Sequence, residues 1–149
     1  MQDICITPLQ PSDKDAVVDL LGAQMREHRI EQGTENMSRV VQSVLADERH
    51  GFFLVARVGE EVVGVAYVAT MQSVEHGGRL GWLEELYVSP AHREQGIGSL
   101  LMTAILERAG QLGLVAIELE VDVEHQRAES LYARFGFRRL PRARWVKKL

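Results

Sequence analysis

Two glycines, Gly96 and Gly98, stand at the start of a segment that otherwise has the composition of a good helix. The first turn of a helix exposes backbone N–H groups and the positive end of the helix dipole, and glycine lets the main chain approach a bound phosphate closely. Because Arg-Glu-Gln-Gly-Ile-Gly (93–98) lies between a predicted strand and this helix, the spacing indicates a phosphate site. A tight turn that only needs a permissive backbone is the alternative.

Two other phosphate-binding motifs are excluded by the residues that follow. A P-loop requires Gly-Lys-Ser/Thr after its second glycine, whereas the chain has Ile97-Gly98-Ser99. A dinucleotide fingerprint requires a third glycine three residues later, where Leu101 stands.

Hydrophobic periodicity predicts the elements that must position these glycines. Strands are expected at 3–7, 51–58, 62–70, 80–89 and 114–122, with two closing strands at 137–140 and 144–149. Helices are expected at 12–30 with Ser12 as N-cap, at 37–48, at 97–112 with Gly113 as its stop, and at 126–135. The order β-α-α-β-β-β-α-β-α-β-β predicts a mixed α/β fold, and the absence of linkers or repeats predicts one domain over residues 1–149.

The composition narrows the class of protein. With 149 residues, 46% hydrophobic and 26% charged, the chain can bury a core of its own. A net charge of −4 argues against a nucleic-acid partner. The sequence contains no apolar run of about 18 residues, so no membrane span is expected. Cys5 is the single cysteine, and the histidines lack metal-ligand spacing, so we expect no disulfide and no metal. A cytoplasmic location is the default expectation, because the first residues lack a secretory pattern.

Two motifs together resemble those of the GNAT superfamily of N-acetyltransferases. Arg-x-x-Gly-x-Gly (93–98) after Leu-Tyr-Val-Ser-Pro is similar to the acetyl-CoA signature, and Arg-Ala-Glu-Ser-Leu-Tyr-Ala-Arg-Phe-Gly-Phe (127–137) is similar to the family's second familiar segment. The predicted element order is also similar, so the resemblance covers essentially the whole chain. It implies the GNAT acyl-CoA N-acyltransferase fold, acetyl-CoA as co-substrate and acetyl transfer to a primary amine.

That reaction needs a neutral amine, a stabilised carbonyl oxygen and a proton for the departing thiolate. An alkyl amine of pKa about 10.4 is mostly charged at pH 7, a handicap on the order of 4–5 kcal/mol, so a proton acceptor nearby is valuable. Glu84 and Glu85 are adjacent on the predicted strand 80–89, which would turn them to opposite faces. Resemblance to diamine and polyamine acetyltransferases favours Glu84 as the catalytic acceptor and as an amine contact, and Glu85 is a further candidate amine contact. Solvated or arginine-paired glutamates are the alternative.

Tyr132 matches the tyrosine of the second motif, and the resemblance implies that it is the general acid. Its hydroxyl, with a pKa near 10, keeps its proton at neutral pH and can donate to a thiolate of pKa about 8.5. The alternative is a core tyrosine, because Tyr132 shares a helical face with Ala128, Leu131 and Phe135.

The resemblance also implies which residues contact the coenzyme. Backbone N–H groups on the strand would hold the carbonyl oxygen (Leu86, Tyr87 and Val88), and those of the following loop would hold the pyrophosphate (Glu94, Gln95, Gly96, Ile97, Gly98 and Ser99). Arg93 either adds a cation or is solvated. His125 replaces the asparagine of many relatives, so that contact is open; an alternative base or a surface histidine are its other interpretations. Ala128 completes the expected coenzyme contacts.

The acceptor is expected to be a small cationic amine, such as a polyamine, a lysine-like amino acid or an aminoglycoside. Glu35 and Glu31, in the segment between the first two helices, are possible amine contacts or parts of a solvated loop. Glu118, Glu120 and Asp122 share one face of the strand 114–122 and form an acidic trough or a solvated stripe. A protein N-terminal or lysine acetyltransferase and a non-catalytic acetyl-CoA-binding module are the alternatives. A homodimer is possible by analogy alone.

Overall fold

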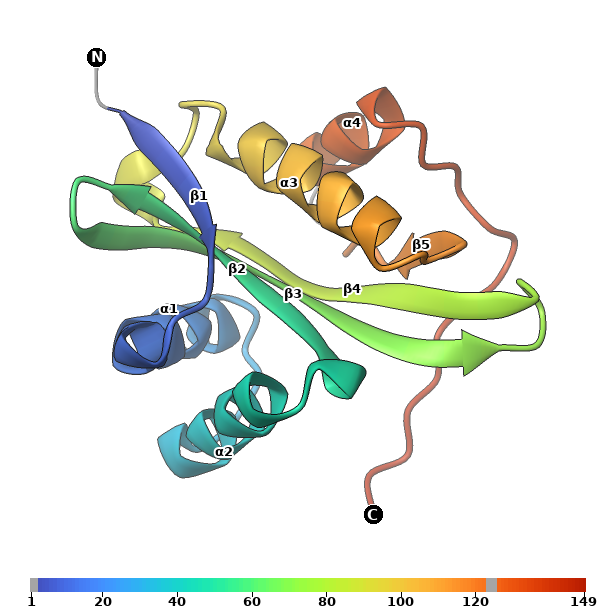
Figure 1. Ribbon diagram of the computed structural model, residues 1–149, viewed down its shortest axis with the longest axis horizontal. Helices are drawn as coiled ribbons and strands as arrows, with labels where there is room; N and C mark the ends of the chain where they lie inside the picture. The colour runs from blue at the N-terminus through green and yellow to red at the C-terminus, as the bar shows by residue number, and fades with distance from the viewer. Residues whose placement is uncertain (1–2, 123–125) are drawn as a thin grey trace.

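A sheet of five strands forms the centre of the computed structural model, which describes residues 3–122 and 126–149 (Figure 1). The strands are β1 (Ile4–Pro8), β2 (Gly51–Val58), β3 (Glu61–Ser73), β4 (Gly78–Val88) and β5 (Ala116–Leu119), adjacent in that order. β1 to β4 pair antiparallel, whereas β5 is parallel to β4. The mixed sheet predicted from the sequence is therefore confirmed.

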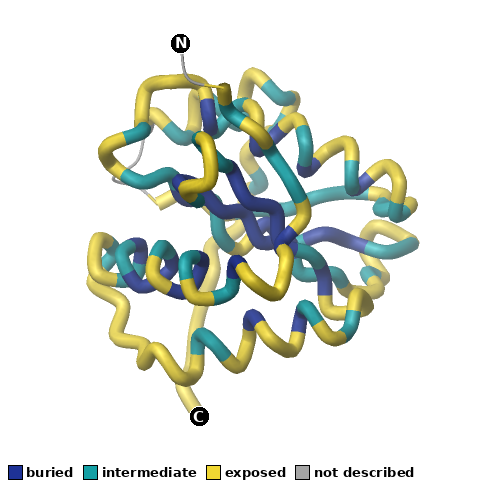
Figure 2. Tube along the Cα trace, turned by 60° about the vertical axis from the view of Figure 1, so that its left-hand side comes forward, coloured by how far each residue is buried: buried dark blue, intermediate teal, exposed yellow. Residues whose placement is uncertain are grey.

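Two pairs of helices cover the two faces of the sheet (Figure 1). α1 (Lys14–Glu27) and α2 (Thr34–Ala46) pack on one face, and α3 (Ile97–Gln111) and α4 (Gln126–Arg134) lie on the other. Because side chains alternate along β2, Phe53 and Val55 join the core under α1 and α2, whereas Leu54 and Ala56 join the core under α3. β2 reads as a continuous apolar run because it is buried on both faces. Figure 2 shows the buried residues gathered at the centre of the molecule.

The two predicted closing strands are wrong. Residues 137–149 contain neither helix nor strand, so the order of elements ends with α4. Six Lys and Arg residues crowd this segment with positive charge, and Pro141 lacks the backbone donor that a strand ladder uses. We refer to residues 138–149 as the basic tail; six of the chain's 17 Lys and Arg residues and none of its 21 Asp and Glu residues lie there.

Several helix and strand ends also differ from the prediction. Ser12 is not an N-cap, because Pro11–Asp13 forms a 3-10 turn and Asp13 precedes α1. Asp13 is buried and accepts hydrogen bonds from Arg57 of β2 and from the Gln10 N–H, so Arg57 lowers the pKa of its carboxyl. α2 begins three residues earlier than predicted because its first turn is polar and shows no apolar periodicity, and β5 is shorter than the predicted strand 114–122. None of the helices in the described ranges has the length and apolar character needed to cross a bilayer.

β4 is distorted at the residues on which the chemistry depends. Its pairing with β3 shifts between Tyr67↔Glu85 and Val68↔Leu83, so that Glu84 is the extra residue of a β-bulge. The prediction that Glu84 and Glu85 point to opposite faces assumed regular alternation of side chains along the strand. The bulge interrupts that alternation. Pairing with β5 ends at Leu83↔Leu119. Beyond that point β4 has a partner on its β3 side only, within the part of the chain that the structure describes.

Candidate functional site

The start of α3 presents a row of N–H groups without backbone partners in the described part of the chain. Gly96 is the N-cap in the left-handed conformation, with φ 79° and ψ 10°, which glycine adopts without strain. The Leu100 N–H donates to the Gly96 carbonyl at 3.1 Å, so the amides of 97–99 project from the helix end. Glu94 is also left-handed, with φ 65°. The amides of residues 97–99 are therefore available to an anion at the start of α3.

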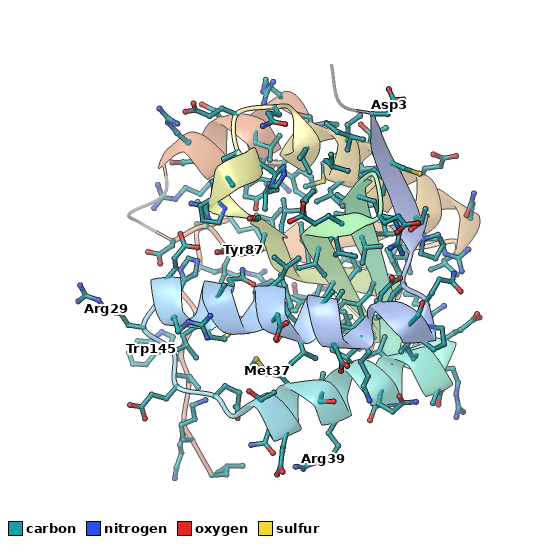
Figure 3. All side chains as sticks on the ribbon, turned by 90° about the vertical axis from the view of Figure 1, so that its left-hand side faces the viewer. Asp3, Arg29, Met37, Arg39, Tyr87 and Trp145 are labelled. Carbon is teal, nitrogen blue, oxygen red and sulfur yellow. The ribbon has the colours of Figure 1, made fainter. Side chains whose placement is uncertain are left out.

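Arg93 contacts protein groups. Its Nη2 lies 3.0 and 2.8 Å from the two carboxylate oxygens of Glu27 at the end of α1, and its Nε donates to the Val88 carbonyl at 2.9 Å. The guanidinium also lies 5.3 Å from the centre of the Tyr87 ring, which Figure 3 shows above the half of α1 that leads to Arg29. The Arg93 hydrogen bond holds the pKa of Glu27 below its ordinary value. Arg93 thus ties the loop before α3 to α1, and its predicted coenzyme contact stays a prediction.

The open edge of β4 exposes alternate amides. The Ser89 N–H donates to the Val63 carbonyl at 2.8 Å, so the amides of Ser89 and Tyr87 point toward β3. By the same alternation, the amides of Leu86 and Val88 point to the open side, as the Val88 carbonyl does where it meets Arg93. Of the three strand residues predicted to hold a carbonyl oxygen, Leu86 and Val88 are therefore oriented for it. Tyr87 instead packs in the core under α1.

α4 brings the second motif to this opening. A Cβ on Gly98 would lie 3.5 Å from a methyl group of Leu131, and Arg127 donates to the Glu94 carboxylate at 2.6 Å. Tyr132 packs against the core under α3, with its ring edge-on to Phe137 at 6.0 Å. Burial raises the pKa of the Tyr132 hydroxyl above 10, so it stays protonated. Within the described residues the hydroxyl has no hydrogen-bond partner, which leaves its proton available.

Glu84 and Glu85 form a coupled pair of carboxylates on the bulge. Desolvation, together with the charge of Glu84, raises the pKa of Glu85 from 4.5 to about 7. The side chain of Glu84 reaches solvent, yet surrounding protein still raises its pKa, against the opposing effect of Arg144. Since the charges interact, an apparent pKa near 7 belongs to the pair. A carboxylate of this basicity is suited to accept a proton at neutral pH.

Gln24 of α1 completes this side of the site. It is 7% exposed, and its amide donates a hydrogen bond to Glu85, which partly offsets the rise in the pKa of Glu85. Its carbonyl oxygen has no donor among the described residues, and such a buried acceptor is costly unless something donates to it. The sequence reasoning missed Gln24. The sequence did contain an indication: Gln24 is a polar residue at helical spacing on the apolar face of α1, seven residues after Val17 and three after Leu21.

The acidic face of β5 borders the pair. Glu118 meets His76 at 2.8 Å, and Asp122 lies 3.7 Å from His28 at the end of α1. Glu120 contributes to raising the pKa of Glu85, which shows that the acidic face extends to the bulge. The predicted trough is thus brought together with Glu84 and Glu85, although histidines already contact two of its carboxylates.

The remaining predicted residues lie elsewhere. Glu35 is exposed in the first turn of α2 and lines a shallow depression with Lys14, Ser38 and Arg39, apart from Glu84. Glu31 lines a groove of about 540 Å³ between α1 and α2 that contains none of the predicted catalytic residues. Ala128 is partly buried on α4, and His125 lies outside the described residues. In the ranges that the structure describes, no three His, Cys, Asp or Glu side chains are grouped to hold a metal ion.

Comparisons with known proteins give relatives that are N-acetyltransferases. The chain is 33% identical over 104 residues to N-acetyltransferase 8F1 of Rattus norvegicus, which is 70% of this chain and 46% of that protein. It is also 33% identical over 94 residues to aminoalkylphosphonate N-acetyltransferase of Salmonella typhimurium, covering 63% of this chain and 60% of that one. The chain thus spans about half the length of the curated relatives it matches.

Solved structures show the same fold. The crystal structure of a predicted acetyltransferase with acetyl-CoA from Clostridium acetobutylicum matches with a TM-score of 0.82, over 97% of this chain and 96% of that one, at 16% identity. The family model for the acetyltransferase (GNAT) family matches residues 16–137, which include both motifs, the bulge and the opening between β4 and β5. This chain belongs to the GNAT family of acetyltransferases.

Proposed function

We propose that this chain transfers the acetyl group of acetyl-CoA to a primary amine and that a small cationic amine is its preferred acceptor. The observation that carries the proposal is the half of β4 beyond Leu83. There the strand has an open edge with outward amides at Leu86 and Val88, and the Glu84–Glu85 pair immediately precedes them. A carbonyl group and an amine held at this one place are positioned to react.

The donor side works through main-chain groups. Acetyl-CoA, when bound, supplies the acetyl group as a thioester. The amides of 94–99 bind its pyrophosphate, and those of Leu86 and Val88 donate to the carbonyl oxygen, where they stabilise the negative charge that develops during attack. Arg93 supports this arrangement by holding the loop to α1. Because fixed backbone dipoles do the binding, the geometry needs little rearrangement.

The acceptor side works through carboxylates. Glu84 is the more accessible of the pair and takes the proton that the ammonium group must lose. Glu85, beneath it, raises the basicity of Glu84 once its own proton has left near pH 7. Gln24, buried behind the pair, holds Glu85 through its side-chain hydrogen bond. Tyr132 then donates its proton to the departing sulfur, which its raised pKa and unpartnered hydroxyl in the described structure favour.

The acidic face supports a cationic acceptor. An acceptor with an anionic group, as the name of the Salmonella typhimurium relative implies for that protein, would be repelled by Glu84, Glu118 and Glu120. A thiol-release assay with acetyl-CoA against diamines, lysine, an aminoglycoside, an aminoalkylphosphonate and N-terminal peptides tests the proposal. We expect turnover of at least one free cationic amine at a higher kcat/KM than any peptide or phosphonate. Preference for a peptide or for the phosphonate would contradict it.

A further inference from the structure

The basic tail places one arginine on the acidic side of the site. Figure 1 shows the chain after α4 running back past the ends of β4 and β5, and Figure 2 shows its last residues as exposed. Arg142 is held by Glu75, with Nη1 2.8 and 3.0 Å from its two carboxylate oxygens. Trp145 is 94% exposed and projects into solvent (Figure 3). Between them, Arg144 turns toward the sheet.

Arg144 lies over an aromatic ring and beside a carboxylate. Its guanidinium carbon is 4.0 Å from the centre of the Trp82 ring, and its Nε is 3.3 Å from a carboxylate oxygen of Glu120. Trp82 belongs to β4 and Glu120 follows β5, so the two side chains lie where these strands begin to part. An aromatic face with one carboxylate is a good site for a single desolvated cation.

This cation site is two residues from the proposed proton acceptor. Trp82 and Glu84 are two residues apart on β4, at most about 7 Å along the strand, since the bulge at Glu84 shortens the regular rise. The charge of Arg144 reaches Glu84, whose pKa it lowers. A molecule that presents one amine to Glu84 would therefore place a second positive group, about four methylene groups away, where the Arg144 guanidinium now lies.

We infer that Trp82 and Glu120 form a subsite for a second cationic group of the acceptor, and that Arg144 occupies this subsite in the absence of acceptor. The inference rests on the proposed function and deepens it: the acceptor is a dication, with an ammonium or guanidinium group distal to the reacting amine. Arg144 is then an internal competitor that the acceptor displaces. Because the side chains of Arg144 and Glu120 are about 60% exposed, displacement is easy.

The kinetic test compares 1,4-diaminobutane with n-butylamine, which lacks the second cation. Arg144→Ala removes a charge that acts on Glu84 whichever amine is bound, so the test is the ratio of the two amines: KM for the diamine should fall about three- to tenfold relative to KM for n-butylamine. In that background, Trp82→Leu should raise KM for the diamine and not for n-butylamine. Arg142→Ala is the matched control, because it removes a tail arginine that pairs with Glu75 instead, and we expect no change. An unchanged or higher ratio of the diamine KM to the n-butylamine KM in Arg144→Ala would overturn the inference.

A binding measurement separates the subsite from catalysis. The chain has two tryptophans, so Trp145→Phe leaves Trp82 as the single fluorophore. Titration of 1,4-diaminobutane into this variant should change the Trp82 emission, with tighter binding when Arg144→Ala is added and no response to n-butylamine. A response without any turnover would support the subsite and refute the proposed function. No response in either background would refute the subsite even if amines are acetylated.

Discussion

The two sides of the opening between β4 and β5 are built from different parts of the polypeptide. On the donor side, the contacts proposed above come from amides within one continuous segment, residues 86–99, and a left-handed Gly96 precedes the helix that presents part of them. On the acceptor side, side chains from four segments converge: Gln24 from α1, Glu84 and Glu85 from β4, Glu120 after β5, and Arg144 from the basic tail. The donor side is therefore expected to tolerate most side-chain changes, whereas the acceptor side should respond to nearly every one.

The largest effect is expected at Tyr132, whose side chain is proposed to donate a proton to the departing sulfur of the donor. Tyr132→Phe keeps the ring and its contact with Phe137 and removes only the hydroxyl. We expect kcat at pH 7 to fall about 100-fold or more, with an unchanged melting temperature and an unchanged Kd for coenzyme A. Since burial raises the pKa of this hydroxyl above 10, the parent should show no loss of activity up to about pH 10. Full kcat in the variant would show that Tyr132 is only a core residue.

On the acceptor side, the two glutamates should separate by their pH profiles. Glu84→Gln should lower kcat/KM about 30- to 100-fold at every pH, because the proton acceptor is lost. Glu85→Gln should cost less, and its main effect should be on the pH profile. In the parent Glu85 loses its proton near pH 7, so the part of the activity that depends on its negative charge rises through that value; without Glu85 this rise should be lost. A larger loss of kcat/KM in Glu85→Gln than in Glu84→Gln would show that Glu85, and not Glu84, is the proton acceptor.

Gly96 should be an exception to the expected tolerance of side-chain changes on the donor side. Gly96→Val has space for its side chain but places a β-branched residue at φ 79°, so the amides must shift, and we expect the Kd for coenzyme A to rise about tenfold. Gly113→Val is the matched control: it too has space and a φ of 70°, but it follows the other end of α3. Both variants should be destabilised alike, measured by thermal unfolding. Equal losses of coenzyme affinity would mean that general destabilisation, and not the cradle, is responsible.

The smallest effect is expected for Arg93 and Glu27, the ion pair that holds the loop before α3 to α1. Arg93→Ala and Glu27→Ala should each raise the Kd for coenzyme A about two- to fivefold, and the double variant should be no worse than either, because both break one partly exposed ion pair. If Arg93 instead contacts the pyrophosphate directly, Arg93→Ala alone will cost much more than Glu27→Ala.

The same contrast explains what the sequence could predict. Gly96, Gly98 and the helix after them are contiguous, so the local sequence was sufficient to predict that α3 begins at Ile97. The bulge at Glu84 arises from pairing with β3, 17 residues earlier at Tyr67, and no local pattern indicated it. Likewise Glu27, Gln24 and Arg144 reach the site only through tertiary packing. The predicted strands 137–140 and 144–149 do not form, although both segments contain large apolar residues, because composition alone does not provide a strand partner.

The central claim is that the amides of residues 94–99, Leu86 and Val88 bind the donor from an open strand edge. Titration of the ¹⁵N-labelled protein with coenzyme A, followed by NMR, tests it directly. We expect the largest amide shifts, and new protection from hydrogen exchange, at Gly96, Ile97, Gly98 and Ser99, with smaller shifts at Leu86 and Val88 and none at Gly113. No binding, or shifts confined to α1 and α2, would contradict the account.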